Sequence, residues 1–259
     1  MQGAALAILI PVVGTTLGSA FVFMMRDAMP RLMQKGLLGF ASGVMVAASV
    51  WSLLIPGIAM RDDLGSLASV PAAVGFVMGM AFLLMVDTLI PHLHADSKSP
   101  EGPKSHLSRA QMLALAVAIH NLPEGMAVGV VVADAMATGG SMTASGALAV
   151  SLGIAIQNVP EGAIISMPMK AAGGSAVKSF SMGTLSGLVE PLGAVAVILL
   201  AGIIEGILPY LLGFAAGAML FVVVEELIPE ASSGRHSNIS VIGFGVGFVL
   251  MMLMDTILG

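Results

Sequence analysis

Ile119-His120-Asn121-Leu122-Pro123-Glu124-Gly125 lies inside a long apolar run, and Ile156-Gln157-Asn158-Val159-Pro160-Glu161-Gly162 repeats its pattern further along the chain. In a helix, residues three or four positions apart share a face. The polar side chains of each stretch therefore point the same way: His120, Asn121 and Glu124 in the first, and Gln157, Asn158 and Glu161 in the second. A carboxylate in hydrocarbon is costly unless it is paired or bound, so it marks a functional site. We expect the two helices to present these groups to a shared divalent metal ion.

The composition is that of an integral membrane protein. Of the 259 residues, 57% are hydrophobic and only 10% are charged, whereas a soluble domain carries about 25% charged residues. The net charge of -5 comes without any basic cluster, which argues against nucleic acid as a partner. The absence of cysteine from the sequence excludes disulfides and thiolate metal sites.

The apolar runs are long enough to cross a bilayer, which takes about 20 mostly apolar residues. Eight such runs lie at 3–25, 36–58, 70–91, 109–133, 143–167, 181–203, 207–229 and 240–258. They lack the alternation of barrel strands, so we predict an all-α protein. The first run has no basic segment before it, and we expect it to be a span rather than a cleaved signal. Residues 1–259 then form one polytopic domain with a polar loop at 92–108.

The basic residues predict the orientation. Nine of the ten Lys and Arg residues fall in alternate loops on one side of the predicted spans, and only Arg61 falls on the other. Basic loops face the cytoplasm. The loop at 92–108 is therefore predicted to be cytoplasmic, and both termini are predicted to be extracytoplasmic.

Three pairs of spans repeat each other. Residues 38–43 recur as 212–217, and 75–79 followed by Asp87 recur as 243–247 followed by Asp255. The two polar stretches are the third pair. Each pair is separated by an odd number of spans, so its members run in opposite directions. The sequence thus predicts a 3+2+3 inverted repeat, a design in which transporters bind substrate near the midplane, where the halves meet.

The prolines and polar side chains of the two stretches are of the types that form a metal-binding site. Pro123 and Pro160 cannot donate a hydrogen bond to the carbonyl four residues back, so each is expected to bend its helix and free a main-chain oxygen. Imidazole, carboxylate and amide groups suit Zn²⁺ and tolerate Fe²⁺, Mn²⁺ or Cd²⁺. Glu190, which precedes Pro191 in the sixth span, is a third carboxylate within the membrane.

The paired His-Asn-Leu-Pro-Glu-Gly and Gln-Asn-Val-Pro-Glu-Gly motifs resemble those of the ZIP family of divalent metal transporters, bacterial members above all. The resemblance covers the whole chain and implies a binuclear centre. One position would be formed by His120, Glu124, Gln157 and Glu161, and the other by Asn121, Glu124, Asn158, Glu161 and Glu190. Some relatives have aspartate where Asn158 stands. Members are often homodimers, so a homodimer is a candidate assembly.

The same resemblance implies a route on either side of the centre. On the cytoplasmic side it would be formed by Asp87, His92, His94, Glu225 and Glu226, and on the outer side by Asp255. Ser42, Met45 and Ser49 share one face of the second span and are further candidates to line the path.

We therefore expect a carrier in a bacterial inner membrane that brings Zn²⁺ into the cytoplasm as its substrate, with no resident cofactor. A metal-selective channel is an alternative, because the same ligands could line a pore. An exporter is another, because the sequence does not fix the direction of flux. An intramembrane metal-dependent hydrolase is disfavoured because the sequence has no His-Glu-x-x-His motif. We therefore expect no enzymatic activity.

Overall fold

The computed structural model describes residues 2–24, 30–89, 109–137, 142–171, 173–203 and 206–258, and every regular element in these ranges is helical. The α-helices are α1 (Gln2–Met24), α2 (Arg31–Ala48), α3 (Ile55–Ala59), α4 (Val70–Leu89), α5 (Arg109–Met136), α6 (Ala144–Ala171), α7 (Ala176–Gly187), α8 (Val189–Ile203), α9 (Leu208–Val222), α10 (Ile228–Ser232) and α11 (Ile239–Leu258). Shorter turns are η1 (Ser49–Leu54) and η3 (Val223–Leu227), both π-helical, and the 3-10 helix η2 (Asp62–Leu67). The predicted all-α class is confirmed.

Seven helical runs within the described ranges are long and apolar enough to cross a membrane. They correspond to the predicted spans 1, 2, 3, 5, 6, 7 and 8. Helix α5 occupies the place of the predicted fourth span at 109–133 but is not one of the seven. The count of eight therefore stays a prediction. The loop at 92–108 lies outside the described residues.

The predicted sixth span is not one helix. It begins at Ala176 rather than at residue 181, and it divides into α7 and α8 at Leu188. Pro191 has no N–H for the carbonyl of Gly187. At the break itself, the Leu188 N–H donates to the Leu185 carbonyl, three residues back, at 3.1 Å. The hydrogen-bond ladder is thus broken just before Glu190.

The predicted second and seventh spans each contain a π-helical turn. The turn η1 lies between α2 and α3, and η3 lies between α9 and α10. Each is followed by a proline, Pro56 or Pro229, that cannot donate to the carbonyl four residues back. The loss of that hydrogen bond helps to explain the looser π register. Such π-turns occur frequently at functional sites, and η3 contains Glu225 and Glu226.

Glycines bring four pairs of helices into main-chain contact. At Gly39 and Gly43 of α2, an added methyl group would overlap a carbonyl oxygen of α11, and at Gly213 and Gly217 of α9 it would overlap one of α4. The same applies to α1 against α6 and to α5 against α8. Small residues permit this close approach between membrane helices. The two glycine pairs belong to the repeated segments 38–43 and 212–217, so equivalent residues make equivalent contacts.

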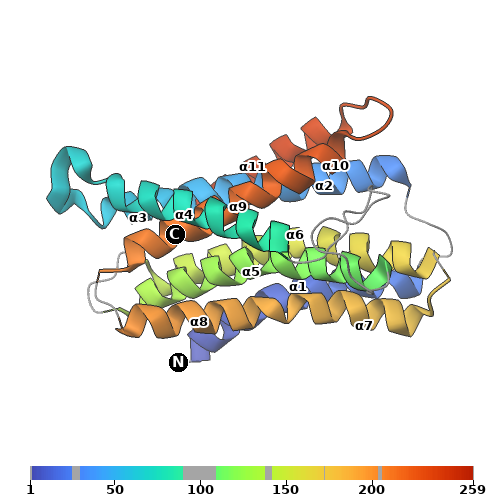
Figure 1. Cartoon of the computed structure of the whole chain (residues 1–259), viewed down its shortest axis with the longest axis horizontal. Helices are drawn as coiled ribbons and strands as arrows, with labels where there is room; N and C mark the ends of the chain where they lie inside the picture. The colour runs from blue at the N-terminus through green and yellow to red at the C-terminus, as the bar shows by residue number, and fades with distance from the viewer. Residues whose placement is uncertain are drawn as a thin grey trace.

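These contacts divide the helices into two groups (Figure 1). Helices α1, α5, α6, α7 and α8 pack together in the lower part of the view, and α2, α4, α9 and α11 form the upper part. The N- and C-terminal ends lie toward the same end of the bundle. Contacts of α5 with α9, and of α6 with α2 and α11, join the two groups.

Arg61, the one basic residue on the opposite side in the charge pattern, is paired in the structure. Its guanidinium donates to both carboxylate oxygens of Asp63, at 3.0 and 3.2 Å. This hydrogen-bonded pairing holds the pKa of Asp63 below its ordinary value. Arg61 therefore adds little net positive charge to its loop at neutral pH, which leaves the charge asymmetry of the loops intact.

Candidate metal site

The two polar stretches lie in the middle of α5 and α6, and Glu190 lies in the first turn of α8. Helix α5 packs against both α6 and α8 around these groups, and side chains link α6 to α8. The side chains of Asn121, Glu124, Gln157, Asn158, Glu161 and Glu190 are all buried, with at most 8% exposed. The side chain of His120 lies outside the described set, although its backbone belongs to α5.

Two hydrogen bonds link the polar groups across the helices. The Gln157 amide donates from Nε2 to Glu124 Oε1 at 2.8 Å, which joins α6 to α5. The Asn158 amide donates from Nδ2 to Glu190 Oε1 at 3.0 Å, which joins α6 to α8. Each carboxylate is thus held at one oxygen by an amide from the second motif, and its other oxygen is left for another partner.

Three carboxylates share this interior. Glu124 lies within electrostatic range of both Glu161 and Glu190. Among the side chains that the structure describes, however, no three of His, Cys, Asp and Glu stand close enough to ligate one ion. Like charges in a low-dielectric interior repel strongly, and the amides of Gln157 and Asn158 stand beside two of them. The cluster is therefore an assembly of carboxylates and amides rather than a tight acidic triad.

Several buried oxygens of this cluster lack a hydrogen-bond donor. Within the described part of the chain no partner is found for Asn121 Oδ1, Glu124 Oε2, Gln157 Oε1, Asn158 Oδ1 and Glu190 Oε2. All five are acceptors, while the Asn121 amide nitrogen donates to the Ser186 carbonyl at 3.1 Å. Buried polar atoms are nearly always satisfied. A desolvated cation is a suitable partner for these five oxygens, because it takes the place of the missing hydrogen-bond donors.

The sequence reasoning missed the contribution of α1. Thr15 donates from Oγ1 to Glu190 Oε1 at 3.1 Å, and the Pro11 carbonyl lies 3.4 Å from the Asn158 amide nitrogen. Both residues face the same carboxylate–amide pair. A weak signal for them was present, because Pro11 stands inside an apolar run and the polar Thr15 follows it one helical turn later. Without a second copy, it was not distinctive.

The residues expected along the route lie nearer the helix ends. Asp255, near the end of α11, is half-buried and accepts a hydrogen bond from Ser52 Oγ at 2.7 Å. Glu225 is exposed in η3, while Glu226 beside it and Asp87 near the end of α4 are partly exposed. His92 and His94 fall outside the described residues. The structure thus brings none of these described side chains into the central cluster.

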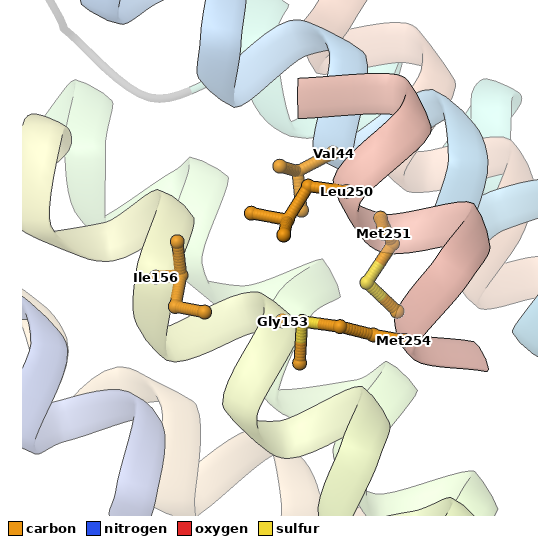
Figure 2. A pocket seen from close by; sticks show the side chains of 6 residues that line it. All are labelled: Val44, Gly153, Ile156, Leu250, Met251 and Met254. Atoms are coloured by element: carbon orange, nitrogen blue, oxygen red, sulfur yellow. The ribbon is translucent and has the colours of Figure 1, made fainter. Parts of the chain in front are cut away.

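The three candidates on the second span, Ser42, Met45 and Ser49, are all buried, and their place along the path stays a prediction. Ser42 and Ser49 are buried, and each hydroxyl donates to a carbonyl of its own helix at 2.8 Å. Nearby, α2, α6 and α11 form a shallow, half-open apolar recess (Figure 2), lined by Val44, Gly153, Ile156, Leu250, Met251 and Met254. Its lining offers no oxygen or nitrogen side chain, so it does not suit a hard cation.

The chain is similar to known transport proteins over nearly its full length. It is 37% identical to the human zinc transporter ZIP11 over 95% of this chain and 94% of that protein. It is 36% identical to the zinc transporter ZIPB of Bordetella bronchiseptica over 95% of this chain and 78% of that protein. The zinc transporter GufA of Myxococcus xanthus is 34% identical, over 95% of this chain and 96% of its own length.

A family model agrees with these relatives. The model described as "ZIP Zinc transporter" matches residues 94–255, which contain both polar motifs and Glu190. The family consists of transporters, which excludes the enzymatic alternative. The seven apolar helical runs agree with a multi-pass integral membrane protein. The chain belongs to the ZIP zinc transporter family.

Proposed function

We propose that this protein carries divalent metal cations, chiefly Zn²⁺, across a bacterial inner membrane into the cytoplasm. The observation that carries the proposal is the set of buried acceptor oxygens between α5, α6 and α8 that lack a hydrogen-bond donor among the described residues. A desolvated cation satisfies such oxygens, and the relatives named above are zinc transporters. Fe²⁺, Mn²⁺ and Cd²⁺ suit the same ligands.

The proposed centre has two positions. His120, Glu124, Gln157 and Glu161 form the first, and Asn121, Glu124, Asn158, Glu161 and Glu190 form the second, so that both motif glutamates bridge. The carboxylates of the second position move closer together when the ion binds, because in the structure no three described acidic side chains stand close enough to share one ion. The hydrogen-bonded pairs Gln157–Glu124 and Asn158–Glu190 support this division, since each pair belongs to a different position. Mixed nitrogen and oxygen ligands bind less tightly than a structural cysteine site, and a transported ion must be able to leave.

The proposed setting is an inverted repeat of eight spans with both termini outside. The equivalent glycine contacts of α2 with α11 and of α9 with α4 support the repeat. The nine basic residues in alternate loops support the orientation. In many transporters with inverted repeats, one helix bundle rocks against another around a central site, and the two helix groups of Figure 1 are candidates for the moving bundles.

The proposed route runs from Asp255 at the outer face to Asp87, His92, His94, Glu225 and Glu226 at the cytoplasmic face. The spacing of the glycine contacts supports the inner half of it. Gly75 and Gly79 of α4 meet α9 at Tyr210 and Phe214. Continuing this register along the two helices places Asp87 close to the turn η3, where Glu225 and Glu226 lie.

Uptake into proteoliposomes tests the proposal directly. Purified protein in vesicles with a trapped zinc-sensitive dye is expected to give saturable Zn²⁺ entry above that of protein-free vesicles, because a binding site must be filled in each cycle. Competition by Cd²⁺, Mn²⁺ and Fe²⁺ for Zn²⁺ uptake ranks the apparent affinities of the transporter for these ions. Entry no faster than in protein-free vesicles would contradict the proposed transport. Single-channel currents in planar bilayers would show that the protein is a channel rather than a carrier.

A further inference from the structure

We propose that Thr15, on α1, is a positioning residue for the metal site. Its hydroxyl and the amide of Asn158 hold one oxygen of Glu190, so that the other oxygen of Glu190 faces the cation. The inference rests on the proposed function, because it assigns a role toward the same site. It adds a helix that neither motif contains and that the matched family model at 94–255 does not reach.

The hydrogen bonds to Glu190 carry the inference. Glu190 Oε1 accepts from Thr15 Oγ1 at 3.1 Å and from Asn158 Nδ2 at 3.0 Å. The Pro11 carbonyl lies 3.4 Å from each of the same two donors. A hydroxyl has a single proton, and the shorter distance favours Glu190 as its acceptor. Hydrogen bonds to a charged oxygen are also the stronger ones.

The opposite oxygen of Glu190 shows what this arrangement achieves. Glu190 is 1% exposed, and no donor among the described residues reaches its Oε2. A carboxylate fixed at one oxygen by two donors from two different helices cannot rotate without breaking both bonds. Partners of this kind orient a metal ligand and tune its affinity without touching the ion. Thr15 thus acts on the ion through Glu190.

The packing around Thr15 keeps its hydroxyl in place. Thr15 is fully buried, and Gly187, at the end of α7, lies against it. A methyl group added at Gly187 would stand 2.9 Å from Thr15 Cβ, 3.0 Å from Oγ1 and 3.1 Å from Cγ2. Glycine at this position lets α7 approach the whole side chain. The Thr15 side chain is therefore closely packed on the side that faces α7.

Two substitutions at this position separate positioning from packing. Thr15→Val keeps the shape and removes the hydroxyl, whereas Thr15→Ser keeps the hydroxyl and removes the methyl group. We expect Thr15→Val to raise the apparent KM for Zn²⁺ uptake about tenfold, the lower range for partners of metal ligands, with Vmax within about twofold. Thr15→Ser is expected to restore most of the affinity. A role in packing alone predicts the reverse order, because Val fills the site better than Ser, and that result would overturn the inference.

A binding measurement and two controls complete the test. Equilibrium Zn²⁺ binding to purified protein in detergent is expected to weaken for Thr15→Val by a similar factor. Ser19→Ala, one turn further along α1, removes a buried hydroxyl that donates to the Gly162 carbonyl at 3.4 Å and is expected to leave KM unchanged. If Glu124→Ala abolishes uptake while Thr15→Val changes neither KM nor binding, the positioning role fails and the proposed function stands. Normal uptake by Glu124→Ala would reject the site itself.

Discussion

Glu124→Ala is expected to reduce Zn²⁺ uptake to the level of protein-free vesicles while the protein stays folded. Glu124 is fully buried, accepts the Gln157 amide at one oxygen and has no donor among the described residues at the other. A buried carboxylate without a cation is costly and lies near two more. Its removal takes away a ligand of the ion and also a source of repulsion in the empty site.

Two measurements of Tm distinguish the loss of metal binding from the loss of the folded structure. Without metal, the Tm of Glu124→Ala in detergent is expected to be no lower than that of the unsubstituted protein. The rise in Tm on adding Zn²⁺, which follows from binding to the folded state alone, is expected to disappear. Glu124→Gln, which keeps the size of the side chain, is expected to lose uptake as well, because the charge is what the cation needs.

The control is a carboxylate outside the membrane-spanning helices. Asp62→Ala, in the exposed turn η2 between α3 and α4, is expected to leave both uptake and the metal-dependent rise in Tm unchanged. Normal uptake by Glu124→Ala, or an equal loss in Asp62→Ala, would remove the central cluster from the transport mechanism.

Gly247→Ala is expected to destabilise the protein, whereas Gly245→Ala, two residues earlier on α11, is expected to be neutral or slightly stabilising. A methyl group at Gly247 would overlap the Phe40 carbonyl of α2, which is main chain and cannot rotate away. At Gly245, apart from its chain neighbours and the backbone of its own helix, no atom of the described residues lies within 4 Å of the added carbon. Overpacking costs about 1–3 kcal/mol, and replacing glycine by alanine inside a helix gains about 0.5–1 kcal/mol.

Thermal unfolding in one detergent measures both variants. We expect Gly247→Ala to lower the Tm by several degrees and Gly245→Ala to shift it little or upward. The two substitutions have the same chemistry on the same helix, so differences in helix propensity cancel between them. Equal effects, or a larger loss for Gly245→Ala, would show that α2 and α11 do not meet as described.

The sequence predicted the parts of the structure that depend on spacing. Apolar length predicted the helices, and the offsets of three residues from Asn158 to Glu161 and of four from Gln157 to Glu161 predicted a shared polar face. The repeated glycines indicated the pairs of segments that the structure shows making equivalent contacts. Spacing works here because a helix in hydrocarbon has little alternative to regular hydrogen bonding.

The parts that could not be predicted depend on contacts between distant segments. Thr15 is 175 residues from Glu190 in sequence, and no local pattern indicates that their side chains meet. The division of the sixth span at Leu188 and the two π-turns depend on how the backbone adjusts to a nearby proline. Other prolines, such as Pro123, lie inside an unbroken α-helix. Proline alone therefore does not determine the outcome.

The contact of α2 with α11 has a consequence for biogenesis. Ser52, in the turn η1 that follows α2, donates to Asp255 of α11 although the two residues are 203 positions apart in the chain. While the ribosome delivers the segments in between, the glycine face of α2 has no permanent neighbour in the bilayer. Nascent chains that stop before α11 would therefore leave the glycine face of α2 uncovered. We expect such chains to be substrates for membrane quality-control proteases.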